Sequence, residues 1–162
     1  MMKKNKLIKW ITLPSLLFLL FGMLTACSLV EFEDLESYPE TTVKKEVTEG
    51  EAYSSKEEVA EYLYIFEELP PNYLTKSKAR ELGWDNSKGN LWEVAEGMSI
   101  GGDYFGNYEG ALPEKEGRDY YEADINYQGG YRNAERIVFS DDGLIFYTDD
   151  HYETFEQLYG EE

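Results

Sequence analysis

Residues 119–149 read DYYEADINYQGGYRNAERIVFSDDGLIFYTD. Runs rich in aromatic and β-branched residues alternate here with the glycine-containing segments 128–130 and 141–143, which are typical of turns. We therefore predict four strands, which cover residues 99–105, 119–127, 134–140 and 143–149. Short turns between consecutive strands indicate antiparallel pairing.

The alternation of side chains along two of these strands predicts a polar face. Over 119–127, Glu122 and Asp124 fall on one side and the apolar residues on the other. Over 134–140, Ile137 and Phe139 would face the core, which sends Arg136 to the opposite side. If the two strands are neighbours, the polar face would gather Glu122, Asp124, Asn126, Arg136 and Arg132. A solvated network of ion pairs is the alternative, and it is the commoner outcome for such a pattern.

The segment before the strands predicts helices. Ser55 and Glu58 fit a capping box at the start of a helix whose apolar positions are Val59, Tyr62, Leu63 and Phe66. Pro70-Pro71 ends it. A second short helix runs from the N-cap Thr75 to Leu82, and a helical turn follows Asn90. Helices followed by consecutive strands indicate an α+β domain over residues 54–162, with the N-terminal helices packed on a C-terminal antiparallel β-sheet.

The first residues of the chain predict export. Four lysines precede an apolar run from Trp10 to Leu24, which is typical of a signal peptide over residues 1–26. Leu24-Thr25-Ala26-Cys27 resembles the lipobox of bacterial lipoproteins, and the alternative is an ordinary secretory signal that ends near a cysteine. We expect lipid on Cys27, an acidic flexible tether over 27–53, and a protein anchored to the extracellular face of a bacterial membrane or released from it.

Composition excludes several classes of site and protein. One Cys and one His rule out an internal disulfide framework and a metal site built from several of these residues. With 33 acidic and 15 basic residues the formal net charge is -18, far from that of a typical nucleic-acid binder. Removal of residues 1–26, with their four lysines and no acid, makes it -22.

Scattered polar segments carry a resemblance to a known family. They are Leu69-Pro70-Pro71-Asn72-Tyr73-Leu74-Thr75-Lys76-Ser77, Leu82-Gly83-Trp84, Ser87-Lys88-Gly89-Asn90-Leu91, Ser99-Ile100-Gly101-Gly102-Asp103, Glu122-Ala123-Asp124-Ile125-Asn126-Tyr127, Arg132-Asn133 and Asp150-His151-Tyr152. Over residues 54–159 the chain resembles barnase and its relatives, the secreted, guanyl-preferring bacterial ribonucleases. The resemblance implies the barnase-like α+β fold and cleavage of single-stranded RNA.

The resemblance also implies roles for individual residues. Glu122 would be the general base that takes the proton of the ribose 2′-hydroxyl, and His151 the general acid that protonates the leaving 5′-oxygen. Their unperturbed pKa values of about 4.3 and 6.5 suit this work near neutral pH, without metal or cofactor. Lys76, Arg132 and Arg136 would hold the phosphate, and Asp124 would orient the arginines.

A base-recognition loop is implied over residues 105–109. Phe105 and Asn107 would belong to the guanine site, where Glu109 would accept hydrogen bonds from the N1 and N2 edge. Tyr152, together with His151, would flank the base, since unpaired bases stack on aromatic rings.

The sequence also departs from the family's pattern. Tyr108 and Ala111 replace basic residues, Ala134 replaces a common hydroxyl and Gly106 a frequent serine, so we expect weaker substrate binding and a less marked guanine preference. Residues 55–162 hold 25 acids and nine basic residues, a net charge of -16, whereas the relatives are basic. We expect a monomer, weak binding to an acidic barstar-like inhibitor, and, as the alternative to an enzyme, an inactive ribonuclease-like binding module on a lipoprotein tether.

Overall fold

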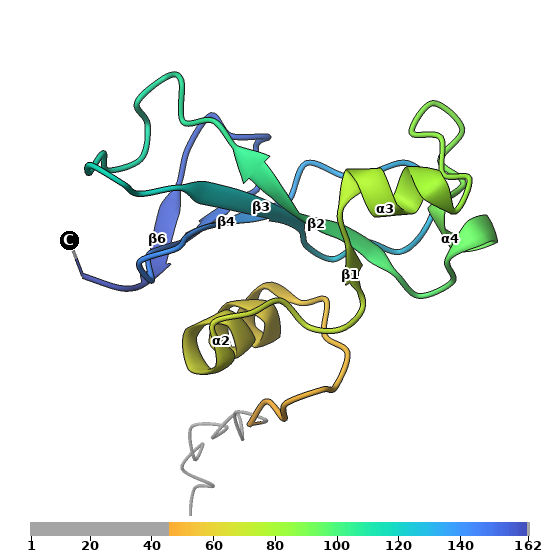
Figure 1. Ribbon diagram of the computed structural model, residues 1–162, viewed down its shortest axis with the longest axis horizontal. Helices are drawn as coiled ribbons and strands as arrows, with labels where there is room; N and C mark the ends of the chain where they lie inside the picture. The colour runs from red at the N-terminus through yellow and green to blue at the C-terminus, as the bar shows by residue number, and fades with distance from the viewer. Residues whose placement is uncertain (1–45, 162) are drawn as a thin grey trace, which may run out of the picture. The chain divides into compact units, whose positions relative to one another are not determined.

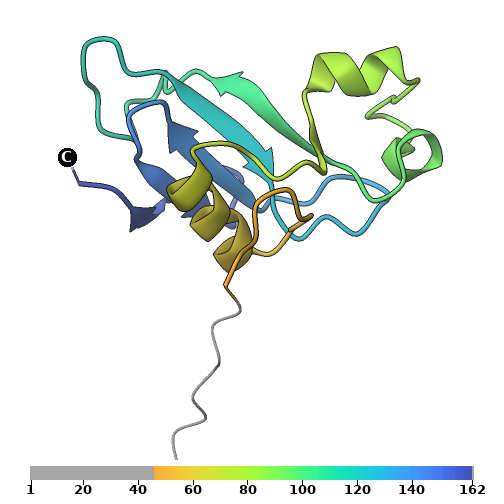
Figure 2. The same ribbon diagram turned by 60° about the horizontal axis from the view of Figure 1, so that its bottom comes forward.

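The computed structural model describes residues 46–161, which form helices and one mixed sheet. The elements are α2 (Lys56–Phe66), β1 (Tyr73–Leu74), α3 (Lys76–Glu81), α4 (Leu91–Val94), β2 (Ser99–Phe105), β3 (Tyr120–Asp124), β4 (Arg136–Ser140), β5 (Ile145–Thr148) and β6 (Glu156–Tyr159). Figures 1 and 2 show α2 against one face of the sheet, with α3 and α4 together near one end of it. The predicted α+β class is confirmed.

The six strands lie in chain order, from β1 to β6. The pairs among β2 to β5 are antiparallel, as predicted. β1 and β6 were not predicted: β6 pairs with β5 in antiparallel orientation, and the two-residue β1 pairs with β2 in parallel, so the sheet is not wholly antiparallel. β3 and β4 are neighbours, and Asp124 lies opposite Arg136. β3 ends at Asp124, earlier than predicted, because Asn126 takes a left-handed conformation with φ 54°.

The helix α2 begins and packs as its sequence predicts. The Ser55 side chain accepts a hydrogen bond from the Glu58 amide, as the N-cap of a capping box does, and its hydroxyl donates to the Glu58 carboxylate at 2.7 Å. Its apolar side packs on the sheet in the first core cluster, which contains Val47, Tyr53, Val59, Ala60, Tyr62, Leu63, Ile125, Ile137 and Ile145.

The compact part of the chain starts before the predicted boundary at residue 54. Val47 and Tyr53 are buried in the first core cluster, and the Tyr53 amide donates to the Asn72 side chain at 3.1 Å. The described residues 46–161 lie in one compact unit. Residues 46–53 therefore belong to the domain and not to the tether, because two of their side chains complete its core.

The other face of the sheet covers a separate apolar cluster. Leu112, Tyr120, Val138, Leu144 and Phe146 form it. Since Ile137 and Ile145 belong to the first cluster while their neighbours Val138 and Phe146 belong to this one, the sheet separates the two. The Tyr120 hydroxyl donates to the Pro113 carbonyl at 2.7 Å, so this cluster also holds the long connection from β2 to β3.

The predicted signal peptide, Cys27 and most of the tether lie outside the described residues. Within residues 46–161 no helix is both long and apolar enough to cross a membrane.

Candidate active site

The polar face predicted from β3 and β4 exists, and it is buried. Glu122, Asp124 and Arg136 are 6%, 1% and 2% exposed, so these side chains do not form the solvated ion-pair face that was the alternative. Asn126 is exposed and donates instead to the Glu135 carboxylate, 2.8 Å away. Charged groups that are removed from water need close partners, and each of the three buried ones has them.

The Asp124 carboxylate joins the two arginines. Arg132 donates to it through Nε at 2.7 Å and Nη2 at 2.6 Å, which is the bidentate geometry preferred by a guanidinium. The Nε atom of Arg136 lies 2.9 Å from Asp124 Oδ1. Arg136 Nη1 donates to the Glu135 carbonyl at 2.7 Å and to Asn133 Oδ1 at 3.2 Å. Asp124 therefore fixes both guanidinium groups, which agrees with its predicted orienting role.

Glu122 lies beside this pair and receives hydrogen bonds on both of its oxygens. Lys76 Nζ donates to Oε1 at 2.5 Å, and the Tyr152 hydroxyl donates to Oε2. Arg132 Nη2 lies 3.9 Å from Oε1. Lys76, Arg132 and Tyr152, which are distant from one another in the sequence, therefore converge on one carboxylate.

The position of Lys76 follows from how α3 begins. Thr75 caps this helix by accepting from the Lys78 amide, and the Lys76 amide donates to Asp103 Oδ2 at 2.8 Å. Asp103 reaches this amide because Gly102, with φ 85°, forms a bulge between two paired residues of β2. Asp103 was not predicted, because a bulge shifts the alternation on which face assignments depend.

His151 lies in a tight loop after β5. His151 and Tyr152 both have left-handed backbones, with φ 60° and 75°, which is costly for residues other than glycine. The two rings lie 4.8 Å apart between centroids. The imidazole is exposed and makes no hydrogen bond with Glu122. Its neighbour Tyr152 lies between them, because the Tyr152 hydroxyl donates to Glu122.

The carboxylate of Asp150 holds this loop. Its Oδ1 accepts from Thr148 Oγ1 at 2.8 Å and from the amides of Glu153 and Thr154 at 3.0 and 2.9 Å, and its Oδ2 accepts from Thr154 Oγ1 at 2.6 Å. Asp150 was not predicted to be functional, although it stands next to His151. An aspartate whose side chain bonds to amides a few residues ahead is a recurrent turn signal.

The predicted base-recognition residues share one pocket of about 340 Å³. Its lining includes the predicted residues Phe105, Asn107, Glu109, His151 and Tyr152. The rings of Phe105 and Tyr152 lie 5.2 Å apart. The Asn107 side chain donates to the Leu112 carbonyl at 2.8 Å and accepts from the Leu112 amide at 3.0 Å, so it maintains the loop and is not free to contact a ligand.

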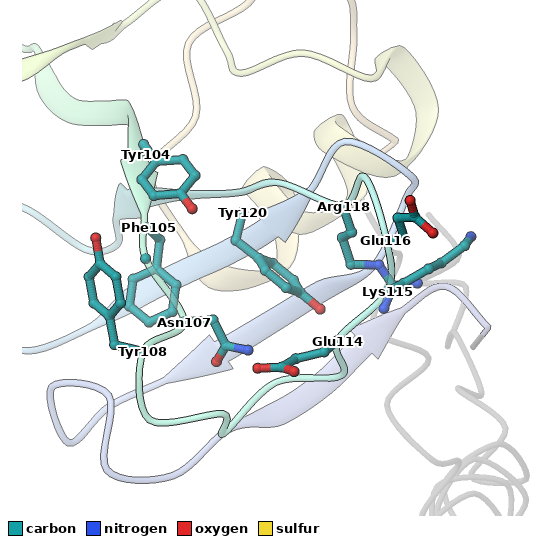
Figure 3. Close-up of a pocket in the computed structure, with 10 residues that line it drawn as sticks. Tyr104, Phe105, Asn107, Tyr108, Glu114, Lys115, Glu116, Arg118 and Tyr120 are labelled. Carbon is teal, nitrogen blue, oxygen red and sulfur yellow. The ribbon is translucent and has the colours of Figure 1, made fainter.

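A second pocket of about 500 Å³ continues from the first along the β2–β3 connection. Figure 3 shows Tyr104, Tyr108 and Tyr120 around it together with Lys115 and Arg118, and Phe105 and Asn107 also line it. Tyr108, which replaces a basic residue of the family, is 94% exposed between the two pockets. An aromatic ring in this position offers a base a stacking surface but no charge for phosphate.

Hydrogen bonds set the ionisation of the central groups. Burial raises the pKa of Glu122, but the hydrogen bonds from Lys76 and Tyr152 and the charges of Lys76 and Arg132 outweigh it, so the pKa is lowered. Burial and the adjacent Glu122 raise the pKa of Tyr152. At neutral pH the site therefore holds an ionised carboxylate and a protonated phenol, which are a proton acceptor and a hydrogen-bond donor.

No group of three or more His, Cys, Asp or Glu side chains within residues 46–161 is arranged to hold a metal ion. The site offers an exposed imidazole, an ionised carboxylate, and the cations of Lys76 and Arg132 beside that carboxylate. These are the groups needed to move a proton from one oxygen to another around a phosphorus atom.

Such groups on one face of the sheet, beside a pocket lined by aromatic rings, define an enzyme that acts on RNA. Comparisons with known proteins confirm this class. Residues 56–159 match the ribonuclease family, and the chain belongs to that family. It is 45% identical to a ribonuclease of Bacillus pumilus, over 89% of this chain and 97% of that protein. A ribonuclease of Heyndrickxia coagulans is 59% identical, over 62% of this chain and 92% of its own. The guanyl-specific ribonuclease St of Saccharopolyspora erythraea is 44% identical, over 33% of this chain and 54% of its own. The protein is an endoribonuclease by this membership.

Proposed function

We propose that the enzyme cleaves single-stranded RNA by transesterification, with Glu122 as base and His151 as acid. Glu122 takes the proton of the 2′-hydroxyl, and the 2′-oxygen forms a bond to the adjacent phosphorus. The bond from phosphorus to the 5′-oxygen breaks, and His151 gives this oxygen its proton. The products are a 2′,3′-cyclic phosphate and a free 5′-hydroxyl. In a second reaction water opens the ring, with His151 as base and Glu122 as acid.

The observation that carries this proposal is the environment of the Glu122 carboxylate. It is buried, ionised and bonded to Lys76, with Arg132 Nη2 3.9 Å away. A phosphate that enters the site competes with Glu122 for these cations and brings its own oxygens next to the base. Lys76, Arg132 and Arg136 then stabilise the negative charge that grows on the equatorial oxygens, which a fixed cation does best in a site that excludes water. No metal or other cofactor takes part in these steps.

We also propose a preference for guanosine at the cleavage site. The pocket shared by Phe105, Glu109, His151 and Tyr152 is of a size for one base, and Glu109 offers an exposed carboxylate to the N1 and N2 donors of guanine. The relative ribonuclease St is named guanyl-specific, which agrees with this preference. Gly106, Tyr108 and Ala134 make the preference less marked than in the family.

The proposal extends to where the enzyme works. The export signal over residues 1–26 and the lipobox-like sequence before Cys27 support a lipoprotein on the extracellular face of a bacterial membrane, tethered by residues 27–45. It acts there as a monomer. A mature protein with unmodified Cys27 and no membrane association would overturn the anchor.

A binding module without turnover is the second candidate, and the net charge of -16 over residues 55–162 favours it, because this charge repels RNA. An acidic barstar-like inhibitor would meet the same repulsion.

The test is cleavage of guanylyl dinucleotides by the chain from Ser28 onward. Dinucleotides largely avoid the repulsion that a long polyanion meets. We expect a 2′,3′-cyclic product from the wild type, about a thousandfold less from Glu122→Ala and His151→Ala, and slower cleavage when adenosine replaces guanosine. Equal inactivity of wild type and both variants would favour the binding module. Equal rates on guanosine and adenosine dinucleotides would contradict the base preference alone.

A further inference from the structure

A third pocket, of about 560 Å³, lies on the face of the sheet opposite the candidate active site. It is bounded by Leu63, Tyr64 and Glu67 of α2 and its C-cap, by Tyr121 of β3, and by Phe139 to Gly143 at the β4–β5 turn. Tyr121 and Glu122 are consecutive in β3, so their side chains point to opposite faces. A molecule in this pocket therefore leaves the catalytic cleft open.

Aromatic rings form the walls of the pocket. Tyr121 packs against Phe139 with ring centroids 5.8 Å apart. Tyr104 does not line this pocket but supports Tyr121 edge-on at 6.5 Å. Tyr64 is 59% exposed, yet its ring stacks on that of Tyr159 at 4.6 Å. These contacts hold the rings in place while one side of Tyr64 stays open to solvent. Fixed aromatic faces attract cations through their quadrupole.

The charged groups at the pocket are negative. Glu67 and Asp141 form no ion pair with a lysine or arginine within residues 46–161. Asp142 differs, because Arg118 and Lys115 already neutralise it at 2.8 and 2.9 Å. α2 also ends here without a basic residue in its last turn, so the negative end of its dipole is uncompensated.

We propose that this pocket docks a basic segment of a partner protein and takes one of its arginine side chains. A guanidinium stacks on aromatic rings and pairs with carboxylates at once, which a compact ammonium does less well. The net charge of -16 over residues 55–162 adds long-range attraction for a cationic partner. The acidic surface, which opposes RNA binding, would thus attract a basic partner to the face away from the cleft.

An oligoarginine peptide is the probe for this site. Its dissociation constant would be measured by calorimetry with the chain from Ser28 onward, in the absence of RNA. We expect Tyr64→Ala and Glu67→Gln each to weaken binding about fivefold, the size of a partly exposed cation–π or ionic contact. Asp141→Asn keeps the oxygen that accepts from the Asp119 amide, and we expect it to weaken binding in the same way.

Matched controls separate this site from general charge attraction. Glu57→Gln removes the same charge from the exposed first turn of α2 and should leave peptide affinity unchanged. Equal weakening by Glu57→Gln and Glu67→Gln would overturn the proposal, as would competition by a guanosine nucleotide, which would place the peptide in the cleft. Spermine that binds as tightly as the peptide would also overturn it, since the occupant would then be a polyamine. The Tyr64→Ala variant should cleave dinucleotides at the wild-type rate. A failure of the proposed peptide binding can therefore be distinguished from a failure of the proposed cleavage chemistry.

Discussion

At the scale of single residues, Glu122 combines burial with ionisation. A buried carboxylate ordinarily binds a proton more tightly, but here Lys76 and Tyr152 donate to both oxygens and reverse the effect on its pKa. Glu122 can accept a proton only when ionised, so the enzyme should lose activity as pH falls through this lowered pKa.

Tyr152→Phe tests how much the phenol contributes to this ionisation. The variant keeps the ring but loses the hydroxyl that donates to Glu122 Oε2, so the pKa of Glu122 should rise. In a pH profile of kcat/KM on a dinucleotide, the acid limb should move to higher pH while the alkaline limb stays in place. If both limbs move together, or neither does, the tyrosine acts only by packing against the base.

The alternation of side chains predicted which residues share the Glu122 face, but not how buried that face is. Periodicity assigns a side to each residue of β3 and β4, whereas burial depends on the β2–β3 connection and the loop after β5, which cover this side. The contact between Tyr152 and Glu122 was also not predicted, because it joins residues 30 positions apart through a left-handed backbone. For Tyr152 the sequence predicted only a base-stacking role.

At the scale of elements, the loop from Thr148 to Thr154 carries both His151 and Tyr152 in strained conformations. Its shape depends on the four hydrogen bonds that Asp150 accepts. Hydrogen bonds from the Thr154 hydroxyl and amide are the chief causes that lower the pKa of Asp150 to about 2. Asp150 is thus a positioning residue, and its contribution to stability is complete above its unfolded pKa and is lost as pH falls through about 2.

Asp150→Ala should lower kcat on a dinucleotide about tenfold, because a displaced catalytic group costs rate even when it is chemically intact. KM should change less, since Lys76 and the arginines remain in place. Asp150→Asn keeps the Oδ1 acceptor for three of the four bonds and should restore most of the rate. The exposed neighbour Asp149 makes none of these bonds, so Asp149→Ala is the control. Equal kcat in Asp150→Ala and Asp149→Ala would contradict the positioning role.

The helices and the strands β2 to β5 were predicted, whereas the short strands β1 and β6 were not. β2 has the predicted bounds, Ser99–Phe105, because it is a continuous run with a clear beginning and end. β1 has two residues between a proline pair and a helix cap, too few to show a period, and its parallel pairing comes from the tertiary fold. β6 reads EQLY and is only partly buried, so its sequence carries little strand signal. The early start of the domain depends on two buried side chains, Val47 and Tyr53, in a stretch that shows no apolar period.

At the scale of the whole molecule, net charge and site charge have opposite signs. Residues 55–162 carry -16, yet Lys76, Arg132 and Arg136, which are three of the nine basic residues of this part, gather at the cleft. Charge over the surface governs how RNA approaches, because it acts over about the Debye length. Charge within the cleft governs the chemistry, because the groups there are close and largely shielded from salt.

Because surface charge acts at long range and cleft charge at short range, long and short substrates should respond differently to ionic strength. Raising NaCl from about 10 to 150 mM shortens the Debye length from about 30 to 8 Å and screens the repulsion of a polyanion. We therefore expect kcat/KM on polymeric RNA to rise several-fold before it falls at higher salt, when contacts between the cations and phosphates weaken.

A guanylyl dinucleotide bears little charge, so its cleavage should change much less over the first part of this range. Millimolar Mg²⁺ should reproduce the rise at lower ionic strength. A steady fall for the polymer from the lowest salt upward would mean that the cations of the cleft, and not the acidic surface, determine the approach of RNA.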